Sequence, residues 1–172
     1  MFKCAIGVLV LFAVCGCEAG VAESAFPGSD GLSWQNPAGE DSKGGSLELD
    51  WQTAASYCDK LEWAKFSDWR LPTLAEAATL VTNCAAFKTA FDAGHYPAVT
   101  TPVCSGKGPG EGGLFTPAGL LGASSWMWTS DQAPAQLVGV KSYYMISYQH
   151  GGAVGSDAET STRDVRCVRS GL

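Results

Sequence analysis

The chain has 172 residues, 46% of them hydrophobic and 16% charged, as expected of one globular domain. Acidic residues outnumber basic ones by 17 to 11, which gives a formal net charge of −6. General binding to the phosphate backbone of nucleic acid needs clustered lysine and arginine, so we expect no nucleic-acid partner.

Residues 1–16 have the layout of a secretory signal. Lys3 precedes an uncharged apolar run shorter than the ~20 residues needed to cross a bilayer, and small residues follow. The segment Val14–Cys17 resembles a bacterial lipobox and predicts cleavage before Cys17, with lipidation of that residue. The alternative is ordinary signal-peptidase cleavage after Ala19, Ala22 or Ala25. We expect an exported cell-envelope protein, held by its lipid at the outer membrane or cell surface without spanning a membrane.

The mature part divides into a tether, residues 17–30, and a single domain, residues 31–170. The tether is rich in Ala, Ser, Gly and Glu without periodicity. The domain has four cysteines, at Cys58, Cys84, Cys104 and Cys167. An even number in an exported domain indicates two disulfides, with three possible pairings. The spacings contain no Cys-x-x-Cys knuckle for zinc, so we expect no metal and no cofactor.

Two helices are expected in the first half of the domain. Residues 31–35 are a candidate strand, and the polar residues 36–46 a loop. Apolar residues at three- and four-residue spacings then predict an amphipathic helix from Asp50, as N-cap, to about Trp63. Thr73 and Glu76 form a capping box, which predicts a second helix that begins at Thr73 and fades near Asn83.

Residues 85–125 form a long excursion rich in Gly, Pro, Ser and Thr, for which we expect irregular structure. Loops of this length are usually disordered or functional, and this one carries Cys84 and Cys104 as a candidate staple. Short strands are expected at 126–129, 135–140, 143–148 and 164–169. Two helices followed by a run of strands indicate the α+β class, with short antiparallel strands, rather than an alternating parallel sheet.

Five segments taken together resemble a known family. They are Gly31–Gln35, Trp51–Cys58, Asp68–Thr73 with Glu76, Trp128–Ser130 and Val165–Arg169. In this order they are similar to the C-terminal domain family of the Legionella collagen-like adhesin, which is related to the Fibrobacter major paralogous domain. The resemblance covers roughly residues 31–169.

The resemblance implies a C-type-lectin-like fold, in which a helix cysteine bonds a cysteine of the last strand and a long loop region carries any binding site. In this chain it implies a bond between Cys58 and Cys167, and we expect Cys84 to pair with Cys104. The adhesin's domain is associated with sulfated polysaccharides and host surfaces. This chain departs from it in having no collagen-like repeat and in being acidic.

The sequence lacks the tripeptide motifs by which calcium-dependent lectins hold a cation and sugar, and Gln132-Ala133-Pro134 is the nearest approach. Asp157 and Glu159 fit a solvated acidic loop better than a cation site. The two histidines, His95 and His150, lie in no recognisable nucleophile motif, so we expect no enzymatic activity. An oxidase of the formylglycine-generating type and a purely structural envelope protein are the alternatives.

Structural roles are expected for most charged and aromatic landmarks. Trp69 should fill the core and Arg70 should hold its charge against Glu76. Strand alternation places Arg166 on the face opposite Arg163 and Arg169, so we expect no anion site shared by all three. Arg163 and Arg169 could act together. The candidate recognition residues are His95, Tyr96, Trp126 and Asp131. They predict a non-catalytic module that binds a polysaccharide or an envelope protein through the region between Cys84 and Trp126.

Overall fold

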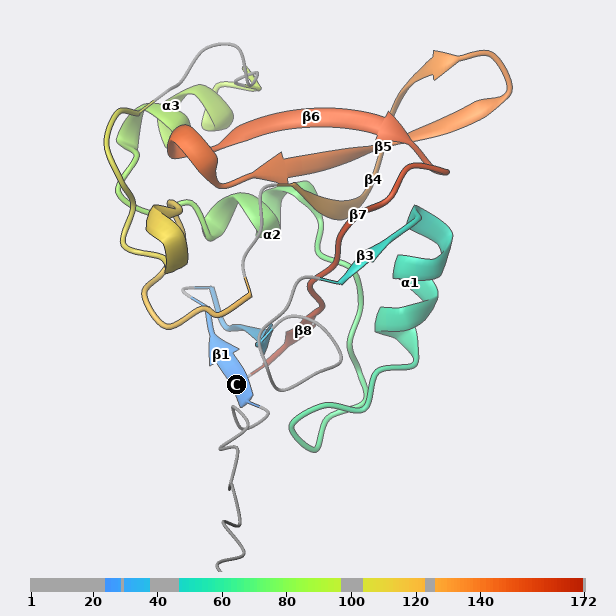
Figure 1. The fold of residues 1–172 in the computed structure, drawn as a ribbon, viewed down its shortest axis with the longest axis horizontal. Helices are drawn as coiled ribbons and strands as arrows, with labels where there is room; N and C mark the ends of the chain where they lie inside the picture. The colour runs from blue at the N-terminus through green and yellow to red at the C-terminus, as the bar shows by residue number, and fades with distance from the viewer. Residues whose placement is uncertain (1–23, 29, 38–46, 97–103, 123–125, 172) are drawn as a thin grey trace, which may run out of the picture.

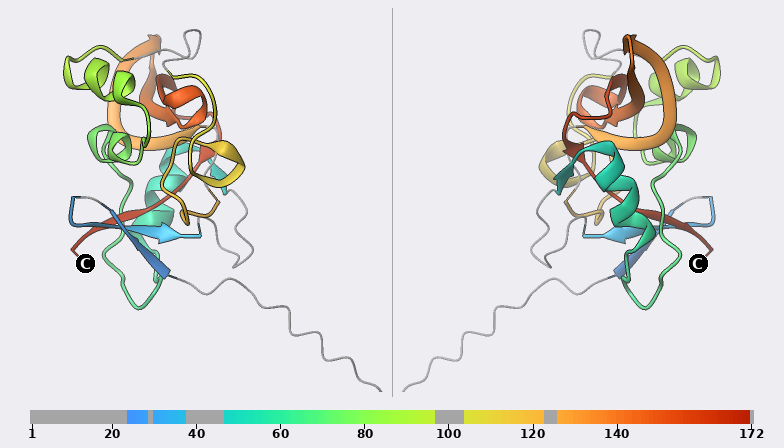
Figure 2. Two further views of the ribbon diagram at one scale, coloured as in Figure 1. Left: turned by 90° about the vertical axis from the view of Figure 1, so that its left-hand side faces the viewer. Right: turned by 90° about the vertical axis from the view of Figure 1, so that its right-hand side faces the viewer.

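The computed structural model describes residues 24–28, 30–37, 47–96, 104–122 and 126–171 (Figure 1). The expected leader and Cys17 lie outside the described residues. The described chain forms three α-helices and two sheets, which confirms the α+β class. The three-stranded sheet and the five-stranded sheet occupy opposite ends of the domain, as the turned views also show (Figure 2).

The three-stranded sheet joins the two ends of the domain. Its strand order is β1 (Ser24–Pro27), β2 (Leu32–Asn36) and β8 (Val168–Ser170), and both pairings are antiparallel. The tether was expected to reach residue 30, but Ser24–Pro27 pair along their whole length with β2, from Ser24 opposite Asn36 to Pro27 opposite Ser33. Regular structure therefore begins earlier than predicted.

The five-stranded sheet has the order β3-β7-β4-β5-β6. Its strands are β3 (Glu48–Leu49), β4 (Met127–Leu137), β5 (Val140–Ser147), β6 (Ala153–Ala158) and β7 (Arg163–Asp164). All pairings are antiparallel except that of β4 with β7. The strands expected at 126–129 and 135–140 are largely one long strand, β4, whose register shifts in two places against β5. The single strand expected at 164–169 is divided between β7 and β8, and β6 was not predicted.

Both predicted helices are confirmed with their caps. In α1 (Trp51–Asp59) the Asp50 carboxylate accepts from the Thr53 amide at 3.0 Å. In α2 (Leu74–Thr79) the Thr73 hydroxyl accepts from the Glu76 amide at 3.1 Å, and Glu76 accepts from the Thr73 amide at 2.8 Å. Both helices end about four residues earlier than expected.

The expectation of two helices is wrong, because a third, α3 (Ala85–Asp92), begins directly after Cys84 in the segment expected to be irregular. Its inner face is built from Phe87 and Phe91, one helical turn apart, whose rings stack at 5.6 Å. Phe87 is buried among the residues of the first core cluster. Tertiary packing of these rings stabilises a helix of only eight residues.

The core has two clusters on opposite faces of the large sheet. The first lies under α2 and α3 and contains Trp34, Phe87 and Ile146. The second contains Trp69, Trp128 and the half-cystines Cys58 and Cys167. Trp69 is 2% exposed, which confirms its predicted core role.

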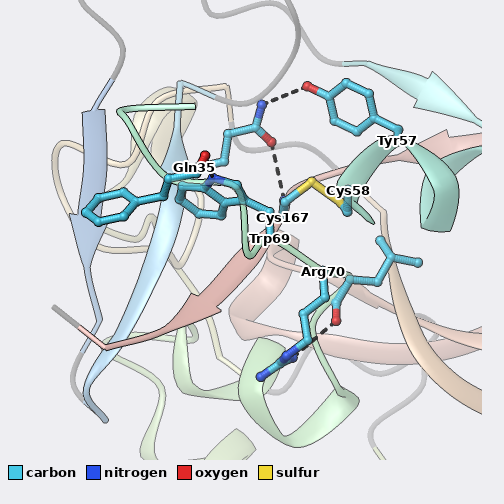
Figure 3. Close-up of a disulfide and its surroundings, with 8 residues drawn as sticks. Gln35, Tyr57, Cys58, Trp69, Arg70 and Cys167 are labelled. Atoms are coloured by element: carbon cyan, nitrogen blue, oxygen red, sulfur yellow. Dashed lines mark hydrogen bonds between the residues drawn. A yellow bond between two sulfur atoms is a disulfide. The ribbon is translucent and has the colours of Figure 1, made fainter. Parts of the chain in front are cut away.

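The expected disulfide pairing is confirmed. Cys58 of α1 bonds Cys167, next to β8, and Cys84 bonds Cys104. Gln35 of β2 supports the first bond, since its side chain accepts from the Cys167 amide and donates to the Tyr57 hydroxyl (Figure 3). One covalent bond and two hydrogen bonds therefore tie together the helix, the first sheet and the end of the chain.

Candidate functional site

Two of the predicted recognition residues lie together at the end of α3. His95 and Tyr96 are both exposed, and Tyr96 is 46% accessible. The Tyr96 ring packs against Phe91 at 5.4 Å and edge-on against Tyr144 of β5 at 5.6 Å. This pair remains a candidate contact surface on the α3 side of the sheet.

The other two predicted residues lie elsewhere. Trp126 is half-buried and packs with the second core cluster, which includes Met145. Tyr144 and Met145 are consecutive on β5, so their side chains point to opposite faces of the sheet. Tyr96 and Trp126 therefore lie on different faces. The Asp131 carboxylate accepts from the Leu74 amide at the start of α2, which gives it a capping contact.

Arg163 and Arg169, the two half-buried arginines near the end of the chain, are each matched by their own carboxylate. Arg163 pairs with Asp157, and Arg169 pairs with Asp68 at 2.6 Å. Since these pairs use different carboxylates, the structure does not bring Arg163 and Arg169 into one anion site.

Arg166 lies on the opposite side, as expected, and is 2% exposed. Its guanidinium donates to the backbone carbonyl of Gln35 at 2.5 Å and to that of Leu121. Burial lowers the pKa of Arg166 to about 10. Its contacts join β2 to the segment before β4, so its role is to hold these segments together.

Two grooves flank α1. The larger, about 760 Å³, runs along Gln52, Tyr57 and Lys60 and ends at Leu47, which follows residues 38–46 outside the described chain. The second, about 650 Å³, lies between α1, residues 70–73 and Ser130 of β4, and we call it the α1–β4 groove. Both volumes fall within the ~300–1,000 Å³ typical of small-ligand sites.

The wall of the α1–β4 groove includes an indole held in place by two contacts. The Trp51 ring stacks on Tyr143 of β5, with centroids 3.6 Å apart and planes inclined by 10°. The Trp51 indole N–H donates to the carbonyl of Thr129 at 2.8 Å. Because the stack and the hydrogen bond fix both the tilt and the rotation of the ring, the groove has a preformed aromatic surface.

The opposite wall carries an ion pair. Arg70 donates through both terminal nitrogens to Glu76, at 2.7 and 2.6 Å, which confirms the predicted pairing. The Arg70 guanidinium and the Thr73 backbone amide hold the pKa of Glu76 below its usual value, and Glu76 in turn raises the pKa of Arg70. The positive charge on this wall is therefore locally balanced.

The remaining polar groups of the groove are hydroxyls and one carboxylate. Ser56 and Ser130 are exposed, and Thr73 is half-buried. The side-chain carboxylate of Asp59, the last residue of α1, has no hydrogen bond or ion pair to any other residue that the structure describes. A preformed aromatic ring beside several hydroxyls and a carboxylate suits a polyhydroxylated ligand, which offers both C–H faces and hydrogen-bonding groups.

Histidine, cysteine and acidic side chains are the usual metal ligands, and the described residues place them as follows. No group of three or more His, Cys, Asp or Glu among them could hold a metal ion. The half-cystines of the mature domain are all bonded in pairs. The side chain of His150 lies outside the described residues, and His95 stands exposed at the end of α3.

The sequence patterns do not predict the groove, although several of its residues lie in segments with a predicted structural role. Trp51, Arg70 and Thr73 lie in the segments that carry the family resemblance, but each was explained by a helix face, an ion pair or a cap. The ion pair and the cap are both present, and Trp51 is the first residue of α1. The groove forms because these residues meet Ser130 of β4, which is distant from them in the sequence.

The comparison with known families gives one clear result. The family model of the Lcl C-terminal domain matches residues 28–169, which confirms the resemblance inferred from the five segments. No curated protein and no solved structure shows a significant match to the chain. None of the described helices has the length and apolarity needed to cross a bilayer.

Proposed function

Because this chain belongs to the Lcl C-terminal domain family, an adhesin-associated module, we propose that it is a non-catalytic recognition domain of the cell envelope that binds a polysaccharide in the α1–β4 groove. Export and lipidation at Cys17 attach the domain to a membrane surface, where adhesion takes place. The observation that carries the proposal is the immobilised Trp51 ring, which lines a groove together with hydroxyls from three distant segments.

The proposed fold type is C-type-lectin-like. Three features support it: the terminal strands pair in one sheet, Cys58–Cys167 ties α1 to the end of the chain, and a disulfide-bearing excursion separates α2 from β4. In such a framework the helix and sheet stay rigid while loops and grooves at their edges carry recognition. The α1–β4 groove is built on the rigid part.

The His95–Tyr96 surface supports a second candidate function, docking of an envelope protein. An aromatic side chain that is 46% exposed and backed by two further rings is typical of an interface anchor. It lacks the groove's combination of hydroxyls with a fixed ring, so we place polysaccharide binding first.

The test is binding of the mature chain, residues 18–172, to an array of neutral, amine-bearing and sulfated polysaccharides. Ser130→Tyr places a bulky side chain at an exposed position of β4 that lines the groove, and we expect it to abolish binding. Ser67→Tyr adds the same side chain at an exposed position outside the groove and should leave binding intact.

Two results contradict the proposal. The first is the absence of binding to every polysaccharide on the array. The second is unchanged binding by Ser130→Tyr together with loss of binding in a His95→Ala, Tyr96→Ala double variant, which moves recognition to the α3 side.

A further inference from the structure

We infer that the ligand of the α1–β4 groove is a polysaccharide with protonated amino groups, which pair with Asp59. This inference rests on the proposed function and adds to it the chemical class of the ligand. It departs from the sulfated ligands that the adhesin resemblance suggests, because the charges around the groove have the opposite sign to those that a sulfate needs.

The first argument is the charge balance of the groove. Arg70 is the only cationic side chain that lines it in the described chain, and both of its terminal nitrogens are used by Glu76. Asp131 adds a carboxylate at the start of α2, beside Thr73 of the groove wall and next to Ser130. Of these carboxylates only Asp59 lines the groove itself, while Glu76 and Asp131 lie next to it. Together the three outnumber the single guanidinium. Lys60, the nearest cation along the chain, lines the other groove.

The second argument is the position of Asp59 in its helix. A carboxylate in the last turn of a helix lies at the negative end of the macrodipole, where its charge is unfavourable. Asp92 ends α3 in the same way, but it has Lys88 one turn earlier at 3.7 Å. Asp59 has no such partner among the described residues, so no contact within that part of the chain offsets its cost. A cationic ligand provides the missing partner.

The third argument is the geometry of the neighbouring groups. Asp59 shares the groove with the fixed ring of Trp51 and with the hydroxyls of Ser56 and Ser130. A sugar ring that packs on the indole presents its substituents at its edge, where the carboxylate and hydroxyls lie. An amino substituent pairs with Asp59 there, whereas a sulfate at the same place is repelled by that carboxylate. The overall charge of −6 adds a long-range preference of the same sign.

The experiment compares deacetylated and fully N-acetylated chito-oligosaccharides of equal length, with heparin as the sulfated probe, by calorimetric titration of the mature chain at a mildly acidic pH at which the sugar amines are protonated. We expect the deacetylated form to bind more tightly than the acetylated form, and heparin not to bind in the groove. Asp59→Asn should weaken binding of the deacetylated form about fivefold, the upper end for an exposed ion pair, and remove the preference. Asp92→Asn, at the matching position of α3, should leave both affinities unchanged.

Equal binding of the two forms, or a preference that survives Asp59→Asn, overturns the inference. If Ser130→Tyr nevertheless abolishes binding of the chito-oligosaccharides, the proposed polysaccharide function stands and only the ligand class is wrong. Heparin binding that Ser130→Tyr abolishes likewise overturns the amine assignment. Failure of all three probes, with no binding on the wider array, contradicts the proposed function itself.

Discussion

The long disulfide should stabilise the domain more than the short one, and the difference can be worked out from the chain. Cys58 and Cys167 are 109 residues apart, and Cys84 and Cys104 are 20 apart. In the chain-entropy model, cross-links that close loops of these lengths contribute about 4.8 and about 3.3 kcal/mol. Each is a large part of a total stability of ~5–15 kcal/mol.

The assay is thermal unfolding, followed by circular dichroism, of two double variants. Cys58→Ala with Cys167→Ala should melt roughly 3–6 °C below Cys84→Ala with Cys104→Ala, since a difference of about 1.5 kcal/mol moves the melting temperature by 2–4 °C per kcal/mol in a domain of this size. Both residues of the long bond are fully buried, so the cavity left by the lost sulfurs acts in the same direction. Equal melting temperatures, or a lower one for the short-loop variant, would refute the reasoning.

Three further predictions concern other parts of the molecule. The pKa of Glu76 is lowered in the folded state, so its contribution is fully present above its ordinary pKa of 4.5 and is lost as pH falls through the lower folded value. Glu76→Gln removes the charge that pairs with Arg70 and should therefore cost about 1 kcal/mol at neutral pH and much less in acid. Urea unfolding at both pH values measures this, and an equal cost at both contradicts it. Gly151 has a φ of +87°, and a Cβ there would lie 2.5 Å from the Cβ of Cys104. Gly151→Ala should therefore lower the free energy of unfolding by roughly 1–3 kcal/mol. An unchanged urea midpoint would contradict this, because it would show that the segment moves aside without cost. Lipidation predicts incorporation of radiolabelled fatty acid and partition into detergent, both lost in Cys17→Ser; an unlabelled, secreted wild-type product would rule it out.

The sequence predicted those features that depend on residues only a few positions apart. The Asp50 cap and the Thr73–Glu76 capping box depend on residues three positions apart, so they could be read directly and are confirmed. Trp69 and the Arg70–Glu76 pair follow from the same short stretch. The disulfide pairing needed more, because the cysteines alone allow three connectivities and the family resemblance selected one.

The missed elements depend on distant partners. Apart from Val154, the residues of β6 are small or polar, with Gly155 near the middle. The strand forms because β5 offers an edge that pairs with all six of its residues. The helix α3 has no side-chain cap, and it is stabilised by burial of Phe87 against residues distant in the sequence. The α1–β4 groove is a product of three segments meeting in space, which no linear pattern encodes.

The central claim is that a polysaccharide binds beside Trp51, and the indole N–H resonances of the protein test it directly. The Trp51 resonance, assigned with Trp51→Phe, should shift saturably as deacetylated chito-oligosaccharide is added to the mature chain labelled with nitrogen-15. Trp34, which is fully buried in the other cluster, should not move, and neither should Trp126. An unmoved Trp51 resonance during saturable binding, with shifts at Trp126 or around Tyr96 instead, would contradict the groove as the recognition site.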